Sequence, residues 1–118
     1  MLAIELKQLV LHALEDIKGN DINCIDVMGK TVIADYMVFV SGTSNRHVKA
    51  LVGNIIVEAN KVGIKPIGIE GLQEGEWVLV DLGDILIHVM QPSVRDFYDI
   101  ESLWDISPSV DGSTVVEC

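Results

Sequence analysis

The stretch WVLVDLGDILIHVM, residues 77–90, restricts the possible fold more than any other part of the chain. Apolar residues alternate on both sides of Gly83 and Asp84, and a glycine in first position is typical of a two-residue hairpin turn. Such a turn fixes the register, so that Val80 faces Ile87 on an entirely aliphatic face. We therefore predict two antiparallel strands with that face against the core.

The other face of this hairpin mixes apolar and ionisable side chains. Its cross-strand pairs are Asp81 with Leu86, Leu79 with His88, and Trp77 with Met90. Asp81 and His88 are diagonal neighbours, close enough for a hydrogen bond. Either another segment covers the face and buries this pair, or the face is partly open and binds a partner through its tryptophan and methionine. A partial cover that leaves Trp77 at the edge satisfies both.

Apolar residues at helical spacing predict two long helices. The first covers residues 3–18, and the second begins after Ser44, a favourable N-cap, and ends at Gly63. Residues 93–104 should form one broken helix or two short ones.

Three further strands are expected at residues 23–28, 36–41 and 66–70, and the middle one is apolar enough to be buried on both faces. The order of elements predicts an α/β fold with a mixed sheet of about five strands flanked by helices. A chain of 118 residues suits one domain. We expect that domain to span residues 1–106, with residues 107–118 as a flexible C-terminal tail.

Acidic residues are concentrated in one part of the chain. Residues 1–69 carry seven acidic and seven basic side chains, whereas residues 70–105 carry nine acidic side chains and only Arg95 as a base. Such a surface repels nucleic-acid phosphates and attracts basic partners. Solubility alone would also explain the acidity, but its segregation favours a basic partner.

The passage GTSNRH, residues 42–47, precedes the second long helix and is a candidate anion site. Backbone N–H groups at a helix start favour negative charge, and Ser44, Arg46 and His47 lie in the first turn. The alternative is that Asp35 or another carboxylate neutralises the two basic side chains internally, and we favour this alternative.

No metal site or catalytic centre is apparent in the sequence. The three histidines are scattered, and alternation places Asp81 on a strand face and Asp84 in the turn, so the two need not converge. No serine or cysteine has a recognisable base partner. We expect no cofactor, no bound metal and no enzymatic activity.

The sequence offers no membrane-directed segment. No run approaches the ~18 apolar residues of a membrane span. The N-terminus, which carries Glu5, Glu15 and Asp16, lacks the pattern of a secretory signal. We therefore expect a cytoplasmic protein without a membrane partner.

Four runs, taken together, resemble the ribosomal silencing factor family, also called Iojap-related proteins. They are ADYMVFVSGTSNRHVKAL, GIEG, WVLVDLGDILIHVM and RDFYDIESLW, and the match spans roughly residues 3–105. The resemblance implies a fold related to nucleotidyltransferases, no accepted catalytic activity, and a capacity for homodimers. It implies binding to the large ribosomal subunit through protein number fourteen of that subunit. There the factor obstructs the small subunit and lowers translation under nutrient limitation.

The resemblance also implies contact residues, namely Trp77, Asp81, Leu82 and Tyr98, to which strand pairing adds Met90. Leu82 lies on the predicted core face, so it contributes only if the end of the hairpin protrudes. The expected mechanism is steric, with little or no direct contact to nucleic acid.

Two alternative functions stay open. A large-subunit assembly factor would use the same binding surface and differ only in timing. A small nucleotidyltransferase would need a Gly-Ser turn followed by paired carboxylates that hold magnesium. Here Ser41 precedes Gly42 in reversed order, and no such pair follows on a strand.

Overall fold

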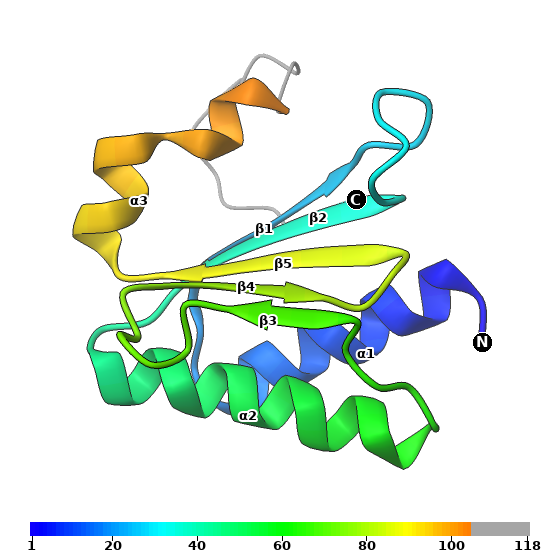
Figure 1. Ribbon diagram of the computed structural model, residues 1–118, viewed down its shortest axis with the longest axis horizontal. Helices are drawn as coiled ribbons and strands as arrows, with labels where there is room; N and C mark the ends of the chain where they lie inside the picture. Colours follow the sequence, from blue (N-terminus) through cyan, green and yellow to red (C-terminus); the bar gives the residue numbers. More distant parts are fainter. Residues whose placement is uncertain (105–118) are drawn as a thin grey trace.

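The computed structural model describes residues 1–104. The tail predicted at residues 107–118 lies outside the described residues. The described chain forms one sheet, with two long helices on one face and two short helical segments on the other (Figure 1). None of the helices in this part of the chain is long and apolar enough to span a membrane.

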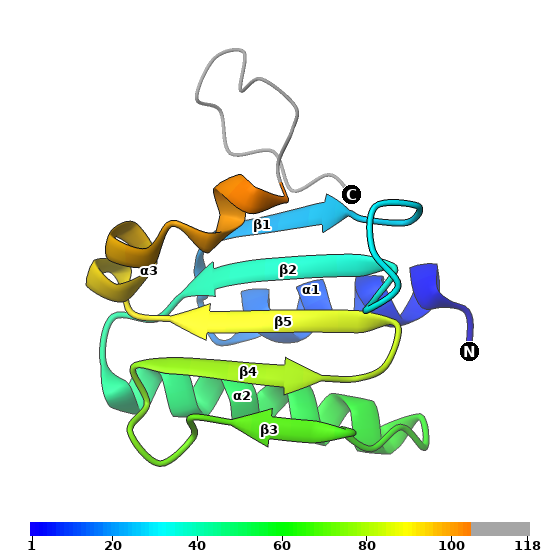
Figure 2. The same cartoon turned by 45° about the horizontal axis from the view of Figure 1, so that its top comes forward.

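The elements follow the predicted order. They are α1 (Ala3–Asp16), β1 (Asn20–Asp26), β2 (Tyr36–Ser41), α2 (Asn45–Lys61), β3 (Gly68–Glu70), β4 (Trp77–Asp81), β5 (Ile85–Met90), α3 (Pro92–Tyr98) and the 3-10 helix η1 (Ile100–Leu103). The strands lie in the order β1-β2-β5-β4-β3, as Figure 2 shows. Among the strands of residues 1–104, only β2 and β5 are parallel neighbours, so the predicted mixed five-stranded sheet is confirmed.

The hairpin has the predicted register. Val80 pairs with Ile87, and the amide of Leu82 donates to the carbonyl of Ile85 at 3.0 Å. Gly83 has a φ of 93°, a left-handed conformation that costs little only for a residue without a Cβ. The turn therefore sends the aliphatic residues of both strands to one face, as alternation requires.

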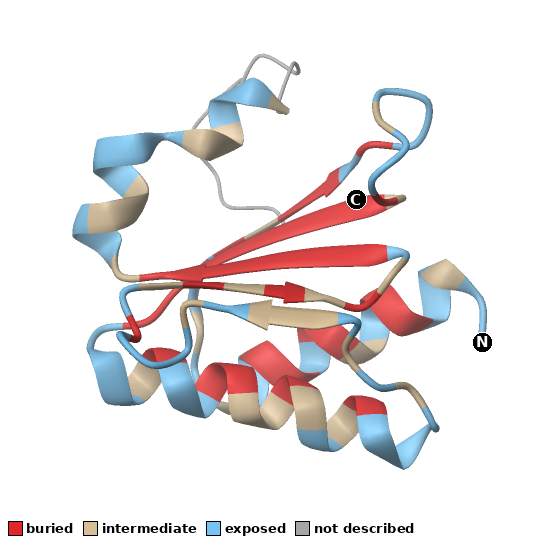
Figure 3. Ribbon diagram, in the orientation of Figure 1, coloured by how far each residue is buried: buried red, intermediate tan, exposed pale blue. Residues whose placement is uncertain are grey.

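The two faces of the sheet are covered unequally. Helices α1 and α2 pack on one face and form the main core with the aliphatic side chains of β2, β4 and β5. A smaller apolar cluster on the opposite face includes Met37, Phe39, Leu86 and Met90, with Val94, Ile100 and Trp104 packed against it from α3, η1 and the residue after η1. Strand β2 is buried on both faces, as predicted (Figure 3).

Helix α1 ends at Asp16, two residues before the predicted end, whereas the start of α2 agrees with the sequence. The side chain of Ser44 caps α2 by accepting the amide of His47 at 3.1 Å. Asp99 adopts a left-handed conformation, with φ of 46°, and separates α3 from η1. The segment is therefore two short helices, which was one of the two predicted forms.

Two left-handed glycines allow a test of the close approach between β3 and β4. Gly71 has a φ of 84°, and a Cβ there would lie 2.1 Å from the carbonyl oxygen of Trp77, whereas Gly63 has a φ of 77° and open space around it. We expect Gly63→Ala to lower the free energy of unfolding by about 1 kcal/mol through backbone strain alone. Gly71→Ala should lower the free energy of unfolding by roughly 3 kcal/mol or more, because β4 or the loop before it must also move to make room for the Cβ. Urea denaturation measures both, and equal losses would contradict the close approach.

Candidate partner-binding surface

Strand pairing brings one residue from each strand into a row on the face opposite α1 and α2. Glu70 pairs with Leu79, Leu79 with His88, His88 with Phe39, and Phe39 with Asn23. Along the row Glu70 is exposed, Leu79 is half-buried, and His88 and Phe39 are buried. The side of this face over β3 and β4 is therefore the more open side.

Five aromatic rings form a continuous series from this row to solvent. Phe39 stacks on His88 at 4.8 Å between ring centroids, and Trp77 lies 6.0 Å from His88. Tyr98 lies 5.1 Å from Trp77, and Phe97 packs edge-on against Tyr98 at 5.0 Å. Phe97 is 81% exposed and Tyr98 is 56% exposed. We call this series the aromatic ladder. Its inner rings are core residues, and its outer rings are available to a partner.

A hydrogen bond fixes the middle of the aromatic ladder. The indole Nε1–H of Trp77 donates to Nδ1 of His88 at 3.1 Å. Burial lowers the pKa of His88 to about 4, although the nearby carboxylate of Glu101 acts to raise it. Near neutral pH the imidazole is therefore uncharged, with its proton on Nε2, and it can accept the indole hydrogen.

Asp81 and His88 do not form the hydrogen bond that one of the two interpretations of this face contained. The Oδ1 atom of Asp81 instead accepts the amide of Gly83 at 2.8 Å. An aspartate at the start of a tight turn readily reaches the amide two residues on, and this local contact competes successfully with a diagonal one. Asp81 thus stabilises the hairpin turn, while the imidazole of His88 forms its hydrogen bond with Trp77.

Polar contacts hold α3 and η1 to the sheet. Neither segment contains a buried residue. Arg95 donates to the carboxylate of Glu101 at 2.5 Å and to Oγ of Ser41 at 2.9 Å, and Asn23 donates to the second oxygen of Glu101 at 2.8 Å. Burial acts to raise the pKa of Glu101, but these hydrogen bonds and the guanidinium charge hold it below its usual value.

The predicted contact residues differ in accessibility. Trp77 and Asp81 are half-buried and Tyr98 is exposed, so all three can reach a partner. Leu82 is 6% exposed within the main core, and Met90 is 1% exposed beneath the opposite face. The hairpin end does not protrude, and alternation alone did not reveal that the second apolar cluster buries Met90. Met90 lies beneath the surface, whereas Leu82 belongs to the core on the other face of the sheet.

Two of the three residues of the predicted anion site, Ser44 and His47, form internal hydrogen bonds. The amide of Thr43 donates to Nδ1 of His47 at 2.9 Å, and Nε2 of His47 lies 2.7 Å from the carbonyl oxygen of Ile17, to which it donates. His47 therefore joins the start of α2 to the end of α1 through backbone groups. Within the described residues, the predicted carboxylate is not a partner of His47. Arg46 is exposed, and Ser44 uses its hydroxyl oxygen as the helix cap.

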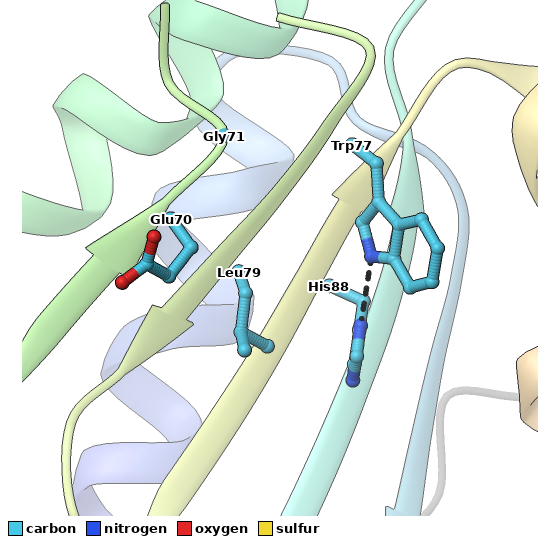
Figure 4. Close-up of a pocket in the computed structure, with 5 residues that line it drawn as sticks. All are labelled: Glu70, Gly71, Trp77, Leu79 and His88. Carbon is cyan, nitrogen blue, oxygen red and sulfur yellow. Dashed lines mark hydrogen bonds between the residues drawn. The ribbon is translucent and has the colours of Figure 1, made fainter.

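A shallow hollow of about 290 Å³ lies beside the aromatic ladder on the open side of the sheet. It is lined by Glu70, Gly71, Trp77, Leu79 and His88 (Figure 4). Within residues 1–104, no three His, Cys, Asp or Glu side chains gather as a metal site requires. The surface offers rings, an apolar wall and carboxylates, which is a chemistry suited to binding.

Sequence reasoning missed Glu70, Phe97 and the Arg95 network. The pairing of Glu70 with Leu79 depends on the loop before β4, whose length and shape conceal the register. Phe97 and Arg95 lie in a helix too short for apolar periodicity to show which side faces the sheet. The one available signal was the FY pair at residues 97–98, next to several acids.

Comparison with known proteins gives a consistent result. The family model described as "Ribosomal silencing factor during starvation" matches residues 2–117. A ribosomal silencing factor of Chromobacterium violaceum is 49% identical over 100 residues, which cover 85% of this chain and 82% of that protein. A crystal structure of a Chromobacterium violaceum protein superposes with a TM-score of 0.87 and 45% identity, covering 98% of this chain and 97% of the other.

A more distant relative carries a different name. The mouse "Mitochondrial assembly of ribosomal large subunit protein 1" is 32% identical over 101 residues, which cover 83% of this chain and 44% of that protein.

The buried imidazole predicts a pH dependence of stability. The pKa of His88 is about 4 in the folded chain and 6.5 as an ordinary histidine, so between these values only the unfolded chain gains the proton. The free energy of unfolding should therefore fall as the pH decreases through this window, by up to about 3 kcal/mol from this group. His88→Gln should lose less stability between pH 7.5 and 4 than the parent chain, measured by urea denaturation. Exposed His12, changed to Gln, serves as the control. Parallel pH profiles for His88→Gln and the parent would contradict the assignment.

Proposed function

Because this chain belongs to the ribosomal silencing factor family, we propose that it binds the large ribosomal subunit and sterically blocks joining of the small subunit. In this proposal the contact is with protein number fourteen of the large subunit, and translation is repressed under nutrient limitation. The family name connects such proteins with silencing and starvation. The particular partner and the steric mechanism are our inference.

The observation that carries this proposal is the exposed end of the aromatic ladder. Phe97 and Tyr98 are large rings turned to solvent, and Trp77 supports them from the sheet. Partly rigid aromatic side chains are typical anchors of protein interfaces. Asp96 and Asp99 flank the two exposed rings in the sequence, so the anchors sit among negative charges.

The charge of this region supports a basic partner. Within the described part of segment 70–104, Glu101 is the only acidic residue in a salt bridge. The remaining carboxylates are not neutralised by ion pairs, and such a surface attracts a positively charged protein while ribosomal RNA repels it. In the proposed mechanism no bond is made or broken, so activity equals occupancy of the subunit interface.

Removing the central ring tests the binding surface. Trp77→Ala should weaken binding to purified large subunits by about 2 kcal/mol, or roughly thirtyfold, because an anchor and the support of Tyr98 are lost together. Trp104→Ala is a matched control, since Trp104 is also half-buried and packs against the same apolar cluster. We expect the control to change binding by less than about threefold. If Trp77→Ala keeps its fold and still co-sediments with large subunits as the parent does, the aromatic ladder is not the binding site.

A second candidate is a large-subunit assembly factor, which the name of the mouse relative favours. A silencing factor should inhibit joining of mature purified subunits, in proportion to its occupancy, when the small subunit is added afterwards. An assembly factor should instead leave joining unaffected, and its deletion should cause large-subunit precursors to accumulate. Sucrose-gradient analysis of both experiments separates the two functions.

The exposed rings could also meet in a homodimer, which we retain as a proposal. Phe97 and Tyr98 would then be covered by a second copy when no ribosomal partner is present. A dimer of this kind would compete with the proposed ribosome binding.

A further inference from the structure

The hollow beside Trp77 is formed by three neighbouring strands and is distinct from the outward-facing rings. Glu70 on β3, Leu79 on β4 and His88 on β5 lie side by side because of the strand register. Trp77 precedes Leu79 by two residues, so both side chains point to the same face. Figure 4 shows the four side chains around the hollow, with Gly71 contributing only backbone.

The walls of the hollow suit an alkyl chain. Leu79 and Trp77 are half-buried, so each presents part of its apolar surface there. Gly71 adds no side chain to the hollow. Its left-handed conformation disfavours one, and a Cβ there would clash with the carbonyl oxygen of Trp77. A shallow, mostly apolar hollow of about 290 Å³ can cover methylene groups but is too small for a folded element.

The outer end of the hollow suits a cation. Glu70 is exposed there and forms no salt bridge within the described residues. Asp81 lies two residues beyond Leu79 on the same face; it does not line the hollow, but it adds negative charge nearby. His88 in the lining does not repel a cation, because its low pKa leaves the imidazole ring uncharged near neutral pH. The indole of Trp77 adds a π surface, which attracts a guanidinium group.

We propose that this hollow binds one arginine side chain of a basic partner, with its methylene groups against Leu79 and its guanidinium between Glu70 and the ring of Trp77. Arginine fits better than lysine because its planar guanidinium can pair with a carboxylate through two hydrogen bonds and also stack on an aromatic ring. An anion would meet the carboxylate of Glu70, and an uncharged apolar ligand would leave that carboxylate without a counter-charge. The inference rests on the proposed function only in assigning this arginine to the ribosomal partner.

The ligand chemistry can be tested without a ribosome. The indole N–H of Trp77 gives an NMR signal that is distinguished from that of Trp104 by the variant Trp104→Phe. We expect Nα-acetylarginine amide, titrated to roughly tens of millimolar, to shift the Trp77 signal with saturation. The uncharged isostere Nα-acetylcitrulline amide should cause little shift. Glu70→Gln should weaken the arginine response by about fivefold or more, because it removes the charge while keeping the shape.

Glu74→Gln is the matched control, since Glu74 is an exposed carboxylate of the same acidic segment that does not line the hollow. It should leave the arginine response within about twofold, as expected for a screened surface charge. Co-sedimentation with large subunits should show the same ranking of the two variants. Equal shifts with citrulline, an unchanged response in Glu70→Gln, or equal effects of the two variants on subunit binding would each overturn the inference. If the parent chain binds arginine amide but no large subunit, the proposed function is contradicted, whereas the assignment of arginine as the ligand of the hollow stands.

Discussion

The register of β4 against β5 is the constraint on which the rest of the structure depends. Because side chains alternate along a strand, a shift by one residue would exchange the core face with the open face. The observed register places Val78 and Val80 against the helices and leaves Trp77 and Leu79 on the other face. The turn at Gly83, held by the carboxylate of Asp81, fixes this register locally. The aromatic ladder and the hollow both follow from it.

The proposed binding surface is accessible because the second face of the sheet is only partly covered. Helices α1 and α2 close the first face with apolar side chains, whereas α3 and η1 contribute no buried residue of their own. They are attached through Arg95, Glu101 and the contact between Tyr98 and Trp77. Together with the packing of Val94 and Ile100 on the second apolar cluster, these contacts fix the position of the short helices without burying their outward rings. The same arrangement leaves Phe97 exposed and keeps the inner rings rigid.

Much of the fold follows from local patterns in the sequence. Alternation predicted the hairpin pairs, an unbroken apolar run predicted that β2 is buried on both faces, and Ser44 marked the start of α2. Long-range pairings were less accessible. Nothing in the sequence indicates that β5 lies between β2 and β4, or that Ile17 supplies the partner of His47. The hydrogen bond considered between Asp81 and His88 fails for the same reason. Asp81 instead accepts the amide of Gly83, and His88 accepts the indole N–H of Trp77, and strand alternation predicts neither contact.

We propose above all that the exposed end of the aromatic ladder contacts protein number fourteen of the large subunit. A photo-crosslinking amino acid placed at Phe97, which is 81% exposed, tests this most directly, with the same group at Val57 on α2, which is 51% exposed, as the control. Illumination of the complex with large subunits should join the Phe97 variant, and not the Val57 variant, to that protein, as identified by mass spectrometry. Crosslinks from Val57 to that protein, or from Phe97 only to other ribosomal components, would contradict the account.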